Sequence, residues 1–433
     1  MGKLNDIIII GGGAAGLSAA CELVRSGAKV SVLEARARLG GRIYTLRETG
    51  ADNPIELGAE FIHGRPPAIF EILNSAGLHV IEANDRRLLS QDGKLRPLKN
   101  FWDIIAGIHS QIRSNGDQTY EQFLQTAKAS QFQKHLAKGY VEGFHASHAN
   151  LISVKGIKEG DEAEEKIDGQ KQFRIAEGYD ALVTPLIRAL PADSIRLGCL
   201  VRGVNWSGGR GIEVFATQAG NELRLRAKRL LITVPHMVLR ESIEGRGGIS
   251  FDPPLEAKRQ AVAQLETGQV LKIVMQFRKP FWEDRKVIGS RGAAAAFGFA
   301  LNMDAPLPVW WTQSPETTNF LTAWAGGAQA DRVTDVRDLR SAAFDSLSRT
   351  FNVSIKQLHR LFVADYFHDW RNDAFARGAY TYLKVGGSEA PKHLGEPIDD
   401  TLFFAGEATS SDFNGTVHGA LESGLRAAAQ LCS

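Results

Sequence analysis

The sequence predicts an α/β fold: a domain built on a parallel sheet, interleaved with a second domain of the α+β type. Three observations predict it. An apolar strand, a glycine-rich turn and an amphipathic helix open the chain, and another apolar strand followed by a helix closes it. A helix-rich stretch and a stretch of short strands separate these two ends. The length of 433 residues also favours two or three domains.

The first expected element is a strand over Ile7–Ile10, because an isoleucine run bounded by a polar residue and glycine is typical of a buried parallel strand. Apolar residues at helical spacing follow over Leu17–Val24, and Gly27 ends that helix. A second strand covers Lys29–Leu33. This order and spacing predict a βαβ unit.

The turn inside this unit has glycines at Gly11, Gly13 and Gly16, and the second strand ends at the acidic Glu34. Such glycines let backbone N–H groups approach a pyrophosphate at the positive end of a helix, and the carboxylate can accept hydrogen bonds from a ribose diol. The same glycine spacing also occurs in purely structural turns. The strand, the helix and the acidic residue together favour a Rossmann-like dinucleotide-binding domain.

The middle of the chain reads differently. From about residue 85 to 180, helical periodicity predicts helices over Phe101–Ile112, Tyr120–Ala129 and Phe132–Phe144, followed by a charged loop over Glu159–Lys171. Alternating patterns then predict strands over Leu200–Trp206, Ile212–Thr217, Glu222–Arg226 and Arg229–Val234, with a turn at Ser207–Gly209 and Pro235 after the last strand.

The remainder mixes both types. We expect strands over Val270–Phe277, Asn319–Ala325 and Leu402–Ala405, the last of which meets Gly406, a helix over Val336–Phe351 and a C-terminal helix that begins near Gly415. The pattern assigns residues 1–84, 185–250 and 391–433 to the nucleotide-binding domain. Residues 85–184 and 251–390 are assigned to a substrate-binding domain.

Composition excludes several classes of protein. Lys plus Arg number 51 and Asp plus Glu 49, without a block of like charges, so no nucleic-acid or membrane-surface partner is expected. The three cysteines, Cys21, Cys199 and Cys432, form no CxxC or Cys/His cluster, so neither a disulfide framework nor a metal site is expected. The chain has no signal-peptide pattern and no run of 18 apolar residues, and we expect a cytoplasmic protein.

Several motifs carry a family resemblance. The segment Glu34–Arg42 reads EARARLGGR, and Leu57–Gly64 reads LGAEFIHG. Near the C-terminus, Phe404–Thr409 reads FAGEAT and Gly415–Ala420 reads GTVHGA. Together these resemble the flavin-dependent amine oxidase family (monoamine oxidase and polyamine oxidase type). The sequences of the last two motifs are most similar to those of polyamine oxidases and lysine-specific histone demethylases. The resemblance covers nearly the whole chain.

This resemblance implies FAD as the cofactor. In the family, the arginine at Arg42 supports the pyrophosphate, Val201 meets the adenine through its backbone, and the helix near Gly415 faces the pyrimidine edge of the flavin. Some monoamine oxidases bind FAD through a cysteine where this chain has Ala379, so non-covalent FAD is expected. The implied cofactor-binding residues are Gly11, Gly13, Ala15, Gly16, Glu34, Ala35, Arg36, Gly41, Arg42, Gly58, Ala59, Glu60, Phe61, Val201, Gly406, Glu407, Gly415, Thr416 and Val417.

The implied catalytic residues are Lys272, Trp370, Tyr380 and Thr416. In the family, the lysine holds a water against flavin N5 and takes part in the reaction with O2; pattern alone equally allows Lys272 to be an edge-strand lysine that points to water. Tyr380 matches one wall of the aromatic cage around the amine, and Thr416 falls where the second tyrosine often stands. Trp370 and Tyr380 could instead be ordinary core aromatics.

The implied reaction is hydride transfer from an amine carbon to FAD, with an imine hydrolysed to a carbonyl compound and O2 reduced to hydrogen peroxide. An L-amino acid oxidase, a polyamine oxidase and a non-catalytic flavoprotein remain alternatives. A histone demethylase is not expected, because the chain has neither a basic excess nor room for chromatin-binding modules. His63, with His145 and His148, has less support as a site residue, although His63 could line the cavity. The expected partners are a small amine and O2, and the oligomeric state is not predicted.

Overall fold

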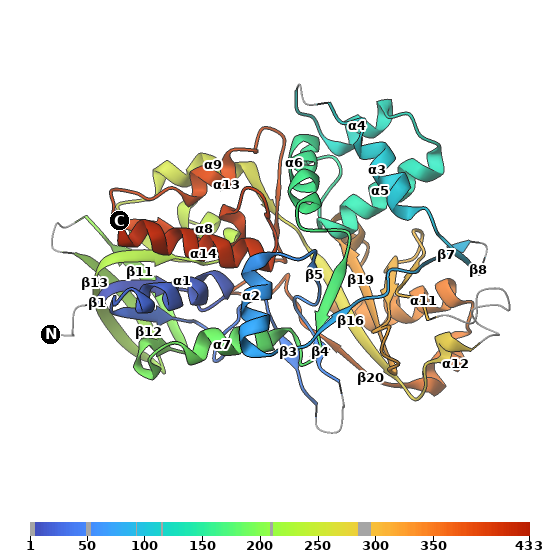
Figure 1. Ribbon diagram of the computed structural model, residues 1–433, viewed down its shortest axis with the longest axis horizontal. Helices are drawn as coiled ribbons and strands as arrows, with labels where there is room; N and C mark the ends of the chain where they lie inside the picture. Colours follow the sequence, from blue (N-terminus) through green and yellow to red (C-terminus); the bar gives the residue numbers. More distant parts are fainter. Residues whose placement is uncertain (1–4, 49–52, 92, 114–115, 208–210, 285–295) are drawn as a thin grey trace.

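The computed structural model describes residues 5–48, 53–91, 93–113, 116–207, 211–284 and 296–433. Figure 1 shows an elongated molecule with two lobes. One lobe holds both chain ends, and the other holds the helices of the middle of the chain. The polypeptide passes between the lobes several times, so neither lobe is one continuous stretch of sequence.

The first lobe is built on a sheet whose strand order is β10-β2-β1-β13-β12-β11-β14, with β22 beside β13. β1 is parallel to β2, β13 and, through β13, β22, which confirms the parallel-sheet domain. The strands are β1 (Asn5–Ile10), β2 (Val30–Leu33), β10 (Ile195–Arg196), β11 (Cys199–Asn205), β12 (Ile212–Gln218), β13 (Asn221–Ile232), β14 (Ser250–Asp252) and β22 (Leu402–Phe404).

The expectation of two separate strands over Glu222–Arg226 and Arg229–Val234 was wrong, because β13 is continuous. Ala227 lies where a break was expected, but it is fully buried and pairs with Ile212 of β12 on one side and with Asn5 of β1 on the other. One long strand therefore serves both the hairpin and the parallel sheet. Of the expected turn at Ser207–Gly209, residues 208 and 209 lie outside the described residues.

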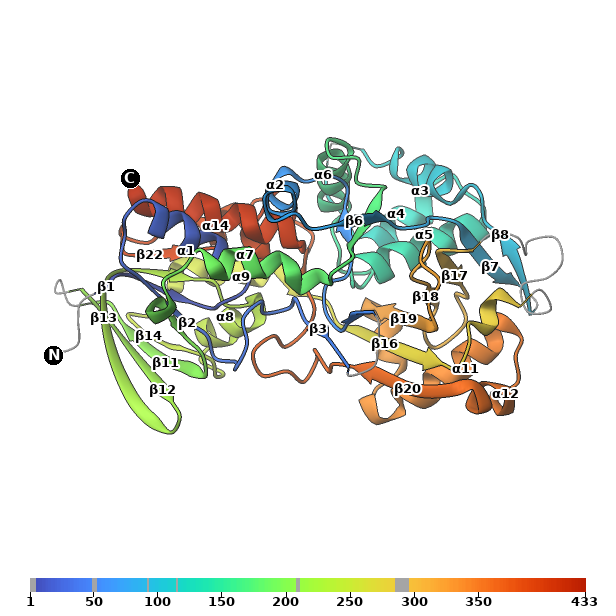
Figure 2. The ribbon, with the colours of Figure 1, turned by 60° about the horizontal axis from the view of Figure 1, so that its bottom comes forward.

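Helices α1 (Ala14–Arg25) and α14 (Val417–Cys432) lie side by side over this sheet, as Figures 1 and 2 both show. Their backbones approach closely at Gly424, where a Cβ would lie 2.3 Å from the carbonyl oxygen of Ala15. The Ser18 hydroxyl donates to the carbonyl of Leu421 at 2.9 Å. This contact brings the N-terminal glycine turn and the C-terminal glycine motif to the same place.

The second lobe is built on a sheet of order β20-β16-β19-β18-β17-β7-β8. Its strands are β7 (Arg87–Gln91), β8 (Lys94–Pro97), β16 (Val270–Phe277), β17 (Phe299–Leu301), β18 (Val309–Trp311), β19 (Phe320–Gly326) and β20 (Phe362–Phe367). Helices α11 (Leu339–Phe351) and α12 (Ile355–Leu361) lie on one side, and α3 (Phe101–His109), α4 (Tyr120–Thr126), α5 (Gln131–Phe144) and α6 (Val154–Glu165) form the group on the other (Figures 1 and 2).

Helix α6 corrects the expectation of a charged loop over Glu159–Lys171. Ser153 caps its start by accepting a hydrogen bond from the N–H of Gly156 at 2.9 Å. Lysines and glutamates four residues apart form ion pairs along it, including Lys155 with Glu159 at 3.7 Å, and such pairs stabilise a helix. The charges that suggested a loop therefore support a helix through Glu165.

Three small sheets join the lobes: β3 (Thr45–Leu46) with β4 (Ile55–Glu56), β5 (Ile62–His63) with β9 (Gln172–Ile175) and β6 (Val80–Glu82), and β15 (Leu265–Thr267) with β21 (Thr381–Leu383). The other helices are α2 (Pro67–Ala76), α7 (Val183–Arg188), α8 (His236–Ile243), α9 (Arg259–Gln264) and α13 (Ala390–Gly395).

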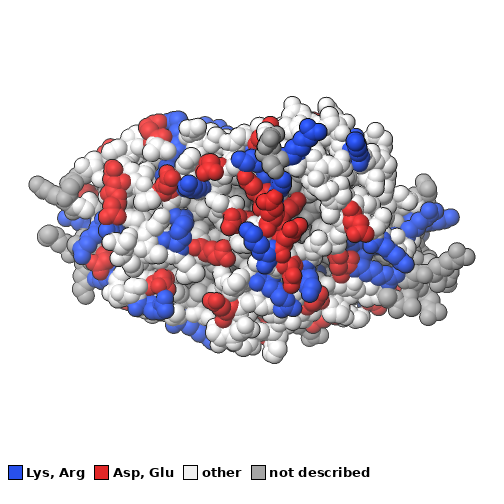
Figure 3. Space-filling model, turned by 45° about the horizontal axis from the view of Figure 1, so that its top comes forward, with Lys and Arg blue, Asp and Glu red and all other residues white. Residues whose placement is uncertain are grey.

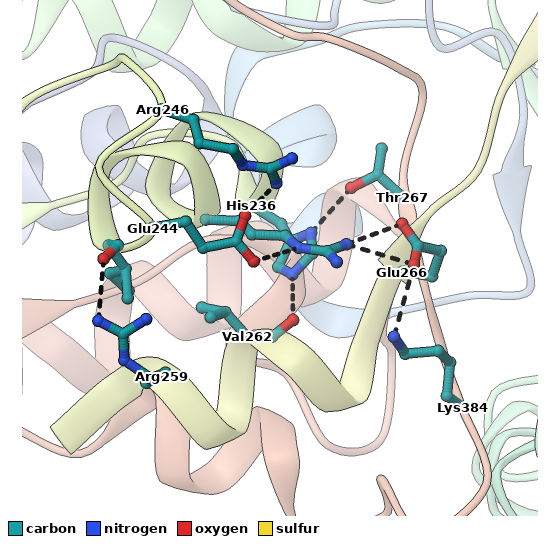
Figure 4. Close-up of polar contacts among 10 residues, drawn as sticks. His236, Glu244, Arg246, Arg259, Val262, Glu266, Thr267 and Lys384 are labelled. Atoms are coloured by element: carbon teal, nitrogen blue, oxygen red, sulfur yellow. Dashed lines mark hydrogen bonds and ion pairs between the residues drawn. The ribbon is translucent and has the colours of Figure 1, made fainter. Parts of the chain in front are cut away.

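A polar network fixes the β15–β21 junction against α8 and α9 (Figure 4). Arg240 of α8 pairs with Glu266 at 3.1 Å, and Lys384 reaches the same carboxylate at 3.5 Å. His236 uses both ring nitrogens: Nε2 donates to a carbonyl of α9 and Nδ1 accepts from the Thr267 hydroxyl, each at 2.9 Å. Burial lowers the pKa of His236, so it stays neutral and can make both contacts.

The surface carries both signs of charge. On the face in Figure 3, Lys and Arg side chains are interspersed with Asp and Glu, and acidic side chains gather near the middle of the molecule. Among the helices within the described ranges, none is both long enough and apolar enough to cross a membrane.

Candidate active site

One large cavity runs between the lobes. Its volume is about 710 Å³, and it extends from the glycine turn after β1 to α5 and α6 of the second lobe. Cavities of roughly 300–1,000 Å³ are typical of sites for organic ligands. The lining comes from both ends of the sequence and from its middle, so a bound molecule would contact both lobes at once.

The glycine turn leaves backbone exposed to this cavity. Helix α1 begins after Gly13 without a side-chain cap, so its first N–H groups are available to a ligand. Among the residues that the structure describes, a Cβ on Gly13 would have only the Cα of Gly41 near it, at 4.0 Å, and a Cβ on Gly406 would meet nothing within 4 Å. Gly16 is different, because a Cβ there would lie 2.0 Å from the carbonyl oxygen of Gly11. Gly16 therefore permits the close packing of α1 on the turn.

Glu34 stands at the carboxyl end of β2 and borders the same cavity. Its carboxylate accepts hydrogen bonds from the N–H of Gly12 at 2.7 Å and of Arg36 at 2.8 Å. The Arg36 guanidinium turns to Asp373, with a shortest distance of 2.6 Å. The carboxylate is thus held in a fixed position by backbone donors, where a ribose diol could reach it.

Glu407 joins several cavity segments together. Its carboxylate contacts Arg42 at 2.9 Å, the Thr381 hydroxyl at 2.6 Å and the N–H of Gly415 at 3.1 Å. Arg42 also donates to the carbonyl of Ala379. Both oxygens of Glu407 are used by the protein, so in this structure the residue organises the cavity wall.

The structure brings together every implied cofactor residue except Gly16, which is not among the lining residues. Those that line the cavity are Gly11, Gly13, Ala15, Glu34, Ala35, Arg36, Gly41, Arg42, Gly58, Ala59, Glu60, Phe61, Val201, Gly406, Glu407, Gly415, Thr416 and Val417. Uncapped backbone at α1, open space at two glycines and the placed Glu34 carboxylate fit a dinucleotide. The family resemblance implies that the flavin would lie against Gly58–Phe61 and the start of α14.

Lys272 lies on β16, which has β19 on one side and β20 on the other, so the edge-strand alternative was wrong. Its side chain is 4% exposed and borders the cavity. The ammonium pairs with Glu60 at 2.8 Å and donates to the carbonyl of Gly58 at 3.1 Å.

Glu60 is itself surrounded by donors. Arg174 contacts the Glu60 carboxylate at 3.0 Å, and the indole N–H of Trp311 donates to the same carboxylate at 2.8 Å. Burial alone would raise the pKa of Glu60, but the charges of Lys272 and Arg174 outweigh burial and hold the pKa below its usual value. The carboxylate is therefore ionised inside the protein.

The other implied catalytic residues also reach the cavity. The indole N–H of Trp370 donates to the carbonyl of Leu57 at 2.8 Å, and the Tyr380 hydroxyl donates to the carbonyl of Phe144 at 2.6 Å. Thr416 is the N-cap of α14: its hydroxyl accepts from the N–H of Gly419 at 2.9 Å and donates to the carbonyl of Phe413 at 2.8 Å. These bonds fix the side chains in this part of the cavity wall.

Three histidines lie along the cavity wall. Burial lowers the pKa of His63 and of His145 to about 4, and that of His418 to about 3. Each has one buried ring nitrogen without a hydrogen-bond partner within the part of the chain that the structure describes. His148, in contrast, pairs with Asp331 at 2.8 Å. His418 was not singled out from the sequence, although it stands inside the C-terminal motif.

Four further lining or supporting residues were missed: Arg174, Trp311, Asp161 and Glu164. The first two come from strands far from Lys272 in sequence, and no local pattern marks them. The carboxylates had a usable signal. Ser153, Gly156, Ile157, Gly160, Asp161 and Glu164 all line the cavity at the i, i+3, i+4 spacing of one helical face. The loop interpretation of this segment hid that face.

Comparison with known proteins shows which family the chain matches and which relatives are similar to it. The family model described as flavin-containing amine oxidoreductase matches residues 14–432. A human lysine-specific histone demethylase 2 is 28% identical over 464 residues, covering 99% of this chain and 53% of that protein. The probable polyamine oxidase 4 of Arabidopsis thaliana is 28% identical over 470 residues, covering 98% and 86%. The chain thus spans about half the length of the histone demethylases it matches.

Solved structures share the fold. A putrescine oxidase bound to putrescine has a TM-score of 0.80 at 21% identity, and cyclohexylamine oxidase from Brevibacterium oxydans has a TM-score of 0.78 at 21% identity. In both comparisons 99% of each chain is covered. The family match over nearly the whole length agrees with the cavity and its glycine turn. This chain belongs to the family of flavin-containing amine oxidoreductases.

Proposed function

We propose that this protein is an FAD-dependent amine oxidase that holds its FAD non-covalently. The supporting observation is that one cavity connects the dinucleotide turn at Gly13 with the buried ammonium of Lys272 and the side chains of Trp370 and Tyr380. When bound, the flavin supplies the acceptor for a hydride from the carbon next to the amine nitrogen, and O2 takes the electrons to form hydrogen peroxide. The imine product hydrolyses in water to a carbonyl compound.

The protein contributes position and electrostatics to this chemistry. Tyr380 and Trp370, each held by a hydrogen bond to backbone, bound the space for the amine. The neutral histidines His63 and His418 each have one buried ring nitrogen without a partner among the described residues, so they can hydrogen-bond an amine without adding positive charge. Lys272 places a positive charge where negative charge develops on oxygen.

Anaerobic mixing tests the proposal directly. The protein is reconstituted with FAD and mixed with a panel of primary, secondary and polyamines, and flavin absorbance is followed; peroxide is then measured in air. We expect bleaching of the flavin by at least one amine and peroxide in proportion to amine consumed. A yellow holoprotein that no amine in the panel bleaches would contradict the proposal and favour a non-catalytic flavoprotein.

Diamines and longer polyamines are favoured among the amines. Asp161 and Glu164 place carboxyl groups in the same cavity from one face of α6. Burial, with a smaller effect of Asp161, raises the pKa of Glu164 to about 8. A second ammonium of the substrate would stabilise the ionised carboxylate there. The polyamine oxidase relatives agree with this substrate class.

Paired substrates and paired variants test this preference. We expect a higher kcat/KM for 1,4-diaminobutane than for butylamine, and Glu164→Gln should lower the ratio at least fivefold. Glu165→Gln is the matched control, because Glu165 lies on the exposed face of the same helix. Equal ratios in all three proteins would reject a carboxylate subsite on α6.

α-Amino acids are expected to be poor substrates. The segment beside the flavin presents Phe61, which has no donor for a carboxylate, next to the ionised Glu60. Arg174 is occupied by Glu60 and by the carbonyl of Thr312, and Arg87 is paired with Asp85 at 2.6 Å. An unpaired buried carboxylate costs several kcal/mol. Comparing kcat/KM for phenethylamine and phenylalanine tests this, and equal or higher efficiency on phenylalanine would instead indicate an L-amino acid oxidase.

A further inference from the structure

We infer that Glu60, supported by Arg174, is a positioning residue for Lys272: it is the counter-ion of the buried ammonium and leaves it one N–H for the cavity. The effect of this arrangement on the reaction with O2 rests on the proposed function. The contact between the three side chains does not depend on that function. Glu60 comes from the segment after β4, Arg174 from β9 and Lys272 from β16.

The hydrogen bonds determine the direction of the lysine. An ammonium has three N–H donors. One of these donors contacts the carboxylate of Glu60 at 2.8 Å, and a second contacts the carbonyl oxygen of Gly58 at 3.1 Å. The third donor remains for a water or ligand in the cavity. Because Gly58 and Glu60 belong to the segment beside the flavin position, the same stretch of backbone would hold both the flavin and the ammonium.

Arg174 makes the arrangement rigid. Besides Glu60 it contacts the carbonyls of Thr312 at 2.9 Å and Ser314 at 3.5 Å, and its guanidinium lies 4.4 Å from the ring centroid of Phe61. Exposed fractions of 4%, 6% and 12% for Lys272, Glu60 and Arg174 show that water does little to stabilise these charges. Two cations and one anion leave one net positive charge beside the cavity.

Within the described ranges, the other charged groups on the strands around Lys272 have partners of their own. Glu56 of β4 accepts from the Thr45 hydroxyl and the N–H of Tyr179, each at 2.7 Å, and burial raises its pKa to about 7. On β19 the residue opposite Lys272 is Trp324. On β20 the register places Asp365 opposite Met275, where it pairs with Arg340, and His368, directly after β20, pairs with Asp373 at 2.7 Å. Glu60 is therefore the carboxylate in direct contact with the ammonium.

The reaction with O2 tests the counter-ion role without any amine. Holoprotein is reduced with dithionite and mixed with O2 from pH 6 to 9.5. For Glu60→Gln we expect a rate within about threefold of wild type at pH 6 and at least tenfold lower at pH 9, because an ammonium without its carboxylate loses its proton sooner. Lys272→Met should be slow at every pH, and Glu142→Gln, which removes a buried carboxylate of α5 that lies 3.9 Å from Lys138, should follow wild type. A Glu60→Gln profile parallel to wild type would overturn the inference.

A second readout needs no flavin. Thermal unfolding of the apoprotein is measured over the same pH range for Glu60→Gln, Lys272→Met and the double variant. We expect the Tm of Glu60→Gln to rise with pH relative to wild type, since its folded state sheds the buried charge before the unfolded chain does, and we expect Lys272→Met to abolish that rise. A rise that persists in the double variant would contradict the inference. Because neither assay uses an amine, failure of amine oxidation leaves both results interpretable.

Discussion

Two glycines of the same turn are expected to fail in different ways when changed to alanine. Gly13 has φ −81° and ψ −174°, which alanine adopts easily, and its Cβ would project into the cavity with its nearest neighbour at 4.0 Å. At Gly16 the Cβ would lie 2.0 Å from the Gly11 carbonyl oxygen and 3.0 Å from the Thr233 hydroxyl. One methyl group thus occupies ligand space, and the other occupies space between α1 and its strand.

The magnitudes follow from these distances. Overpacking costs about 1–3 kcal/mol, and a Cβ 2.0 Å from a backbone oxygen belongs at the upper end of that range. Helix propensity returns up to about 1 kcal/mol on replacing glycine by alanine, so Gly16→Ala should destabilise the apoprotein by about 2 kcal/mol. For Gly13→Ala, lost freedom in the unfolded chain offsets a poorer N-cap, and apoprotein stability should change by less than about 0.5 kcal/mol. FAD affinity should fall at least about tenfold, because the methyl group keeps the pyrophosphate from the backbone.

Thermal unfolding of the apoproteins and titration with FAD, followed by flavin fluorescence, measure both effects. Gly107→Ala in α3 is the control for a glycine change in a helix, since its Cβ would meet nothing within 4 Å and it is exposed. Wild-type FAD affinity for Gly13→Ala would refute the assignment of this turn to the pyrophosphate. Undiminished stability of Gly16→Ala would refute the packing argument.

Three further outcomes are expected. Thr416→Tyr should lower kcat/KM for secondary and bulky amines relative to slim primary amines, and unchanged ratios would show that residue 416 does not border the substrate. The same change removes the N-cap of α14, so the free energy of unfolding should fall by about 1 kcal/mol. Acid precipitation should release the flavin into the supernatant because Ala379 cannot form a thioether, and flavin retained in the pellet would contradict this. The apoprotein should lose stability as pH falls below about 6.5, because the folded pKa values of His63, His145 and His418 are about 4, 4 and 3 and lie below the ordinary 6.5. The unfolded chain therefore takes up protons first. At pH 5 we expect a loss of roughly 1 kcal/mol for each histidine after solvent screening. Urea midpoints at pH 7.5 and 5 measure this, and His145→Gln should reduce the difference.

Local patterns were sufficient for the nucleotide-binding unit. The isoleucine run of β1, the turn at Gly11–Gly16 and the carboxylate of Glu34 lie within one βαβ unit, so their geometry depends on short-range chain stereochemistry. The strand Val270–Phe277 was also predicted with its observed bounds, and the strand predicted over Leu402–Ala405 is observed over Leu402–Phe404. Charge patterns were less reliable, because the same Lys and Glu residues of α6 are compatible with a solvated loop and with a helix that is stabilised by ion pairs.

The sequence alone determined the fold class, the family resemblance and most of the residues around the dinucleotide turn, because each depends on motifs that are contiguous along the chain. Only the tertiary structure decided that Lys272 is buried between strands, that Glu60 and Arg174 surround it, and that Asp161 and Glu164 share its cavity. The physical reason is that a buried charge is defined by its partners, and the partners of Glu60 include Lys272 and Trp311, the latter 251 residues away in sequence. Contacts between residues so far apart leave no periodic signal in the sequence. The burial that makes these ion pairs strong exists only in the folded protein, where both lobes surround them.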